Sequence, residues 1–334
     1  MSLRISRGRL LALTAAAAAS LALPACGSQG ASTPSGATGA TGTSGSTAAP
    51  PKLSASLESQ RLPQPLSGES VAASDHHLLV IGGLDASDSS LQSILSFDLS
   101  SGRIDPAGSL AEPLHDAAAV ALPRGVFVFG GGSTSSISTV EELAPTATAR
   151  PISNLPTPRS DLSATTMGNR AYVLGGYDGA TLSRPVLSTG DGRRFSSIAA
   201  LRIPVRYTAV ATAGSRILVF GGETAAGTPT DAIQAVDPLH GTTHIAGRLP
   251  TPVDHASAVT LGGAAYVLGG EADGRPTDRM WRFDPATGRV QPAGTLPQPV
   301  ADAAAATIDD TAYLVGGVGA TDRPLDTIIS VRYP

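Results

Sequence analysis

Acidic, imidazole and phenol side chains recur at one position of a repeated sequence. Six residues after each of six recurring leucines stand Gly68, Asp116, Asp161, Tyr207, His255 and Asp302. The charged residues beside them are His115, Arg159, Arg206 and Asp254. Aspartate oxygens and an imidazole nitrogen could ligate a metal ion, and an acid and a base with an arginine could act on a sugar acid. Either chemistry requires a fold that brings these positions together.

The leucines belong to a repeat that is marked by pairs of glycines. The pairs begin at Gly82, Gly130, Gly175, Gly221, Gly269 and Gly316, with spacings of 45 to 48 residues, and each pair begins 20 residues after its leucine. A fixed internal distance within a variable period indicates one structural unit whose length changes are confined to loops. Periods of this size are typical of propeller blades or solenoid units.

Each unit is interpreted as four antiparallel strands. The run before each glycine pair, such as 265–268 (AYVL), is apolar without alternation, which predicts a strand buried on both faces. The strand before it is built from small residues, such as 255–259 (HASAV), as strands crowded around a narrow axis require. Turn formers such as Gly262-Gly263 join the two in a tight hairpin, and a third and fourth strand lead to the next leucine. Radial repetition of such units makes a propeller.

The units resemble the Kelch repeat. The stretch 277–288 (TDRMWRFDPATG) is similar to the third strand and following turn of that repeat, and a glycine pair after an apolar strand is its hallmark. The resemblance covers about residues 53–334 and implies an all-β fold, a six-bladed Kelch-type β-propeller over 52–334. The third strands around 140–143 and 186–189 depart from the pattern. We expect 53–59 to pair with 327–332 as the missing fourth strand of the last blade, which closes the ring.

In such a propeller, the elbows that begin at the recurring leucines and the loops after the glycine pairs share one face, which we name the elbow face. Its candidate ligand-binding residues surround the channel mouth, and they are Asp116, Asp161, Tyr207, His255, Asp302, Arg159, Arg206 and His115. The loops after the glycine pairs add Asp85, Asp178, Glu223 and Glu271. This ring could bind a glycan, a peptide or a cation. The plainer interpretation, a solvated mouth lined by polar strand-starting residues, is favoured because sixfold repetition places polar residues there anyway. No metal or cofactor is assigned.

The N-terminal segment has the features of a bacterial lipoprotein signal. Three arginines precede an apolar stretch, and 23–26 (LPAC) resembles a lipobox. We therefore expect a signal peptide over 1–25, lipidation of Cys26, a flexible Gly/Ser/Thr/Ala-rich tether over 26–51 and a location on the outer side of the bacterial cell membrane. An ordinary secretory signal is the alternative. Because Cys26 is the only cysteine, no disulfide can form within the chain.

The composition of the chain and the motifs that it lacks exclude several classes of function. The net charge is −4, and it becomes −7 once the three arginines of the signal are removed, with no basic run to bind nucleic acid. The sequence contains no phosphate-binding loop, nucleophile elbow or zinc-type His/Cys spacing. A radical oxidase with a thioether-linked tyrosine is excluded because the domain has no cysteine.

Two classes of function remain. The first is a monomeric, non-catalytic binding or scaffold module for an extracytoplasmic protein or glycan. The second is a sugar-acid epimerase or mutarotase, because bacterial N-acetylneuraminate epimerase is similar to a six-bladed Kelch propeller. By that analogy, the acid, the base and the residues that bind the substrate carboxylate would be found among His255, Asp302, Arg159 and Arg206. No catalytic residue is assigned from the sequence alone.

Overall fold

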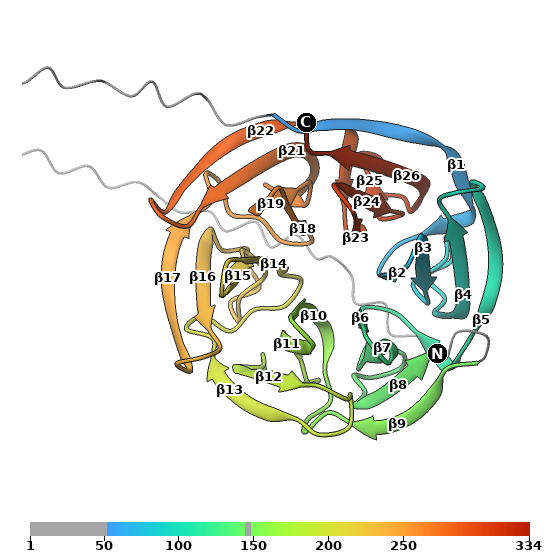
Figure 1. The fold of residues 1–334 in the computed structure, drawn as a ribbon, viewed down its shortest axis with the longest axis horizontal. Helices are drawn as coiled ribbons and strands as arrows, with labels where there is room; N and C mark the ends of the chain where they lie inside the picture. The colour runs from blue at the N-terminus through green and yellow to red at the C-terminus, as the bar shows by residue number, and fades with distance from the viewer. Residues whose placement is uncertain (1–51, 144–147) are drawn as a thin grey trace, which may run out of the picture. The chain divides into compact units, whose positions relative to one another are not determined.

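The computed structural model describes residues 52–143 and 148–334, which form six sheets arranged around a central axis (Figure 1). Each sheet has four main antiparallel strands. The described residues contain no helix, and therefore no helix that could span a membrane. The six-bladed propeller predicted from the repeat is confirmed. The predicted signal peptide, Cys26 and the tether lie outside the described residues.

The strands repeat in the same order from the channel outward. The innermost are β2 (Ser70–Ser74), β6 (Ala118–Leu122), β10 (Ser160–Met167), β14 (Ala209–Ala213), β18 (Ser257–Leu261) and β23 (Ala304–Ile308). The second strands are β3 (His77–Ile81), β7 (Gly125–Phe129), β11 (Arg170–Tyr177), β15 (Arg216–Phe220), β19 (Ala264–Leu268) and β24 (Thr311–Val315). The third strands are β4 (Leu91–Asp98), β8 (Thr139–Leu143), β12 (Pro185–Thr189), β16 (Ala232–Asp237), β21 (Arg275–Asp284) and β26 (Leu325–Arg332). The outer strands are β5 (Arg103–Leu114), β9 (Arg150–Asn154), β13 (Ser196–Ala200), β17 (Thr242–Arg248), β22 (Arg289–Ala301) and β1 (Ser54–Leu66). Two short strands, β20 (Glu271–Ala272) and β25 (Val318–Gly319), lie in loops after glycine pairs.

The hydrophobic core lies between the blades. Each of its six clusters draws residues from two neighbouring blades, as when Phe220 of one blade packs edge-on against Phe283 of the next, with ring centroids 5.8 Å apart. The second strand of a blade therefore meets a neighbour on both faces, which explains why its sequence shows no alternation. We number the blades 1 to 6 in the chain order of their innermost strands, so that blade 1 begins with β2 and blade 6 with β23. Blades 2 and 3 form their third strands, β8 and β12, although the sequences of these strands depart from the repeat pattern.

The ring closes between the two ends of the described chain (Figure 1). Strand β1 pairs antiparallel with β26, with Ser54 opposite Arg332 and Leu57 opposite Ile329. This confirms the expected closure by an N-terminal strand. The strand is longer than expected, because it continues to Leu66 and contains the elbow of the first blade.

The glycine pairs join each blade to the next. In all six repeats, the N–H of the second glycine donates over 2.8 to 3.0 Å to a carbonyl of the elbow that leads from its own blade into the next. The accepting carbonyls belong to Leu114, Arg159, Val205, Val253, Val300 and Leu66. The first glycine lies against the same oxygen. In blade 4, Gly221 has a φ of +58°, and a Cβ there would come 2.1 Å from the Val253 oxygen. The sequence keeps its glycine pairs because two blades meet there.

Candidate functional site

Six equivalent residues, which we name the ring residues, begin the inner edge of the blades: Gly68, Asp116, Asp161, Tyr207, His255 and Asp302. All six adopt the left-handed backbone conformation, with φ between 49° and 60°. From Asp116 onward, the N–H of each donates to the carbonyl of its counterpart in the preceding blade, over 2.7 to 3.1 Å. Glycine, aspartate and histidine are the types among these that tolerate this conformation, whereas the bulky tyrosine at 207 adopts it at a greater cost. These bonds fix the side chains around the channel mouth.

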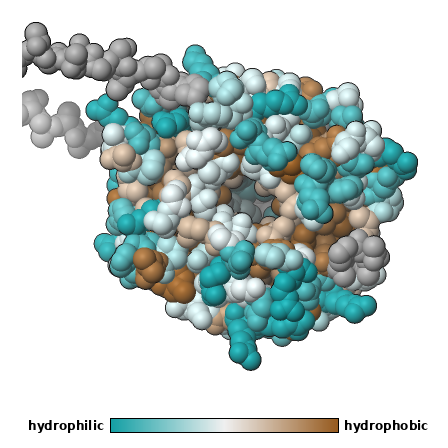
Figure 2. Space-filling model, viewed as in Figure 1, coloured by the Kyte–Doolittle hydropathy of each residue, from teal (hydrophilic) through white to brown (hydrophobic). Residues whose placement is uncertain are grey.

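A cavity of about 170 Å³ occupies the mouth of the channel. The ring residues line it together with the three residues that follow each of them, many of which are alanines. Figure 2 shows the hollow at the centre of the molecule. Pockets that enclose drug-sized ligands typically measure about 300–1,000 Å³. The cavity is therefore smaller than the pockets that typically enclose a ligand of the size of a nine-carbon sugar acid.

Arg206 is held at the rim of the mouth by two carboxylates. Its Nε and Nη2 donate to Glu223 Oε1 at 3.0 and 2.7 Å, and its Nη1 donates to Asp161 Oδ2 at 3.3 Å. Its guanidinium also lies 5.0 Å from the ring centre of Tyr207 and 5.5 Å from that of Tyr177. The guanidinium charge is thus neutralised within the protein, and its planar face is covered by aromatic rings.

His255 is stacked on Tyr207 and paired with a carboxylate. The two ring centroids are 3.9 Å apart with 23° between the planes, and His255 Nδ1 lies 3.1 Å from Asp254 Oδ1. Burial lowers the pKa of His255, but the hydrogen bond to Asp254 and the nearby carboxylates outweigh burial and raise that pKa to about 9. Its imidazole is therefore protonated at neutral pH and donates to Asp254.

The remaining carboxylates of the mouth are crowded and poorly solvated. Burial, followed by the neighbouring charges of Asp302 and Asp161, raises the pKa of Asp116 well above its usual range. Burial also raises the pKa of Asp161, although the hydrogen bond from Arg206 opposes this. Glycine at position 68 makes space for the Asp116 carboxylate, because a Cβ there would lie 2.7 Å from Asp116 Oδ1. Carboxylates so close together share protons rather than all ionise.

The structure brings together seven of the eight predicted site residues. Asp116, Asp161, Tyr207, His255 and Asp302 line the cavity, and Arg206 forms its rim. His115 lies beside them, with its Nε2 4.0 Å from Asp116 Oδ2 and its Nδ1 2.8 Å from Ser90 Oγ. Burial lowers the pKa of His115. Asp85 and Asp178 are not among the residues that line the cavity, and each accepts hydrogen bonds from backbone N–H groups of its own loop.

Arg159 lies elsewhere, which corrects its assignment to the channel mouth. Its side chain is 1% exposed, and its Nη1 donates to the carbonyls of Pro185 at 3.1 Å and Gly175 at 3.4 Å. The sequence carries a signal that would have placed it correctly. Arg159 stands two residues before its ring residue, and the other five repeats have buried Leu or Val there, namely Leu66, Leu114, Val205, Val253 and Val300.

Glu69 is a functional candidate that sequence reasoning missed. It follows Gly68, its side chain is 6% exposed, and its Oε1 accepts a hydrogen bond from the Ala304 N–H of the neighbouring blade at 3.4 Å. Its Oε2 has no hydrogen-bond partner among the described residues. Burial raises its pKa to about 8, so it is mostly protonated at neutral pH. The other five repeats carry Ala, Leu or Thr at this position, which signals a buried site.

Comparison with known proteins agrees with the repeat. Residues 252–297 match the Kelch motif family model. Acyl-CoA-binding domain-containing protein 4 of Arabidopsis thaliana is 29% identical over 204 residues, which are 56% of this chain and 30% of that protein. Acyl-CoA-binding domain-containing protein 5 of the same plant is 33% identical over 124 residues, which are 33% and 18% of the two chains. The aligned part of this chain thus spans less than a third of either relative.

Similarity to a solved structure concerns the fold alone. The structure of YjhT superposes with a TM-score of 0.72, covers 82% of this chain and 99% of its own, and is 14% identical in sequence. The Kelch motif match contains Asp254, His255 and Glu271. The acidic, histidine-bearing part of the mouth therefore lies within the segment that matches the Kelch motif model.

Proposed function

Because the chain is a six-bladed propeller built from Kelch repeats, we propose that it is a non-catalytic binding module whose elbow face docks an extracytoplasmic protein. The observation that carries this proposal is Tyr207, a bulky aromatic residue that is held in a left-handed backbone conformation and stacked on His255. Four of the six ring residues are Gly or Asp, which tolerate a left-handed backbone, so the fold itself requires neither an aromatic nor an imidazole ring there. Strained backbone retained at a surface opening favours a functional role.

The surroundings of this pair suit a protein partner. Tyr177, Arg206 and Tyr207 lie together at the rim, and tyrosine and arginine are the residue types enriched at the centres of protein interfaces. The interblade hydrogen bonds of the ring hold these groups in place before a partner arrives, which lowers the entropic cost of binding. A glycan that lies across the mouth would use the same surface and is an alternative outcome of the test.

The epimerase alternative loses support from three observations. The cavity is smaller than the pockets that typically enclose ligands of that size. Arg206 is already paired with Glu223 and Asp161, and Arg159 is buried against backbone carbonyls. Neither arginine is therefore available to bind a substrate carboxylate at the mouth.

A photo-crosslinking amino acid placed on either face of one blade tests which face binds. Ala225 lies in the exposed loop after the glycine pair of blade 4, beside Glu223 on the elbow face. Ser215 lies in the exposed hairpin turn between β14 and β15, at the opposite end of the same blade. The two positions are matched in exposure and blade, so a difference in adducts reports on the face alone.

We also propose that Cys26 carries a lipid that anchors the propeller to the outer side of the membrane. Cys26→Ser should move the protein from the membrane fraction to the soluble extracytoplasmic fraction and abolish labelling by a radioactive fatty acid, because the chain offers no other cysteine for the lipid. Ser28→Ala, two residues away, should leave both unchanged. Retention of Cys26→Ser in the membrane fraction, or an unlabelled parent protein, would refute the anchor.

A further inference from the structure

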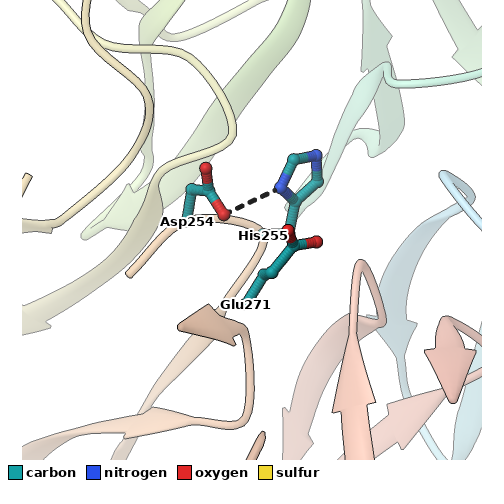
Figure 3. A group of neighbouring side chains, drawn as sticks. All are labelled: Asp254, His255 and Glu271. Atoms are coloured by element: carbon teal, nitrogen blue, oxygen red, sulfur yellow. Dashed lines mark hydrogen bonds and ion pairs between the residues drawn. The ribbon is translucent and has the colours of Figure 1, made fainter. Parts of the chain in front are cut away.

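Metal-ligating atoms converge on the elbow face in blade 5, at Asp254, His255 and Glu271 (Figure 3). One oxygen of each carboxylate and one imidazole nitrogen all lie within 4.8 Å of one another. We propose that these three side chains bind one divalent transition-metal ion of the zinc class, which displaces the proton that His255 shares with Asp254 and releases it to solvent. The proposal goes beyond the binding function above, because it requires no macromolecular partner.

The spacing of the three atoms suits a zinc ion. Zinc lies about 2.0–2.2 Å from nitrogen and oxygen ligands, so two ligand atoms on one ion are at most about 4.4 Å apart. In a tetrahedral site the ligand atoms lie about 3.4 Å apart, so side-chain rotation would have to shorten the widest separation in the trio by up to about 1.4 Å. Asp254 Oδ1 and His255 Nδ1, which are 3.1 Å apart, already have nearly the separation of neighbouring ligands in a tetrahedral site. The imidazole favours zinc-class ions over calcium and magnesium, which prefer oxygen ligands.

The neighbouring blade provides an internal comparison. In blade 4, Arg206 and Glu223 are held side by side by reciprocal backbone hydrogen bonds, and their side chains form an ion pair at 2.7 Å. Asp254 and Glu271 occupy the equivalent positions in blade 5, with the same backbone bonds at 2.8 and 3.2 Å. An aspartate thus stands where blade 4 has its arginine, while the glutamate is kept. A bound dication would supply the positive charge that Arg206 supplies in blade 4.

The trio is held firmly and is accessible from solvent. Backbone hydrogen bonds fix the separation of Asp254 from Glu271, and the stack on Tyr207 fixes the plane of the His255 ring. The side chains of His255 and Asp254 are 15% and 8% exposed, and His255 lines the channel mouth, which gives an ion a path to the site. Three protein ligands would leave at least one coordination position open to water or another ligand.

Calorimetric titration of the whole chain with zinc chloride tests the proposal. The protein should carry Cys26→Ser, which removes the only thiol, and no histidine tag. We expect one zinc ion per chain. Asp254→Arg should abolish binding, because the introduced guanidinium can pair with Glu271 as Arg206 pairs with Glu223. His255→Ala and Glu271→Gln should each weaken binding by at least roughly tenfold. The exposed elbow variant Glu112→Gln should bind as the parent does.

The midpoint of thermal unfolding separates loss of the site from loss of the fold. Without metal, Asp254→Arg should unfold at nearly the midpoint of the parent, and zinc should raise the midpoint of the parent but not that of the variant. Absence of stoichiometric binding by a parent chain that unfolds cooperatively would overturn the proposal, as would binding that survives Asp254→Arg. Equal affinity for zinc, calcium and magnesium would overturn the assigned metal class.

Discussion

Gly221→Ala should destabilise the propeller by at least about 3 kcal/mol and lower its unfolding midpoint by roughly 5–10 °C. The left-handed φ of +58° alone costs an alanine about 1 kcal/mol. The larger part comes from the methyl group, which would lie 2.1 Å from the Val253 oxygen. Relief of that overlap requires the elbow of blade 5 to move and weakens the 2.8 Å hydrogen bond from the Gly222 N–H. Thermal or urea unfolding measures the loss.

Gly214→Ala is the matched control for the cost of placing an alanine in the left-handed backbone conformation. Gly214 lies in the same blade with a φ of +55°, but an added Cβ there meets nothing within 4 Å. It should lose only about 1 kcal/mol. If both variants lose the same amount, close contact between blades is not the reason for the glycine pair.

Glu69→Gln should flatten the pH dependence of stability. Burial raises the pKa of Glu69 from 4.5 to about 8, so the folded state binds a proton that the unfolded state releases between these two values. The contribution of Glu69 to stability is therefore fully present below its unfolded pKa and is lost as pH rises from about 4.5 to about 8. This loss is on the order of 3 kcal/mol between about pH 5 and pH 8. Urea unfolding at the two pH values measures it.

The difference in pH dependence, not the absolute stability of Glu69→Gln, carries this test. The amide cannot ionise, but it places an NH₂ group where the carboxyl Oε2 has no hydrogen-bond partner among the described residues, and this can cost stability at every pH. Exposed Glu112→Gln should keep the pH dependence of the parent. An unchanged dependence in Glu69→Gln would mean that the Glu69 carboxyl is ionised and solvated in the folded protein.

The architecture follows from the sequence because it depends on features that recur six times. The glycine pairs, the small-residue inner strands and the non-alternating second strands all result from the same packing between blades. Six repeats therefore support one interpretation of the unit. Closure by β1 was predictable because residues 53–60 precede the first elbow, where the fourth strand of a blade belongs. The extra length of β1, which continues through the first elbow to Leu66, depends on a local pairing that the repeat does not encode.

The site was predictable in position but not in its interactions. Fixed offsets from the leucines place the ring residues at the mouth, and the same offsets would have placed Arg159 and Glu69 in the buried layer. Side-chain pairing depends instead on distances between blades. The stacking of Tyr207 on His255 arises from consecutive ring positions of two blades, and the Arg206–Glu223 pair joins an elbow to a loop 17 residues later. The stack joins two blades, so spacing within one repeat cannot give it. The Arg206–Glu223 pair lies within one repeat, but it depends on backbone hydrogen bonds between elbow and loop that the spacing alone does not reveal.

Photo-crosslinking from the two faces of blade 4 tests the central claim most directly. In cells that make the full chain, the crosslinker at position 225 should give a discrete adduct with an extracytoplasmic protein, and the crosslinker at position 215 should give none. Tyr207→Ala should reduce that adduct several-fold without loss of folded protein, because it removes the ring that stacks on His255. Equal adducts from both positions, or adducts from position 215 alone, would contradict the assignment of binding to the elbow face.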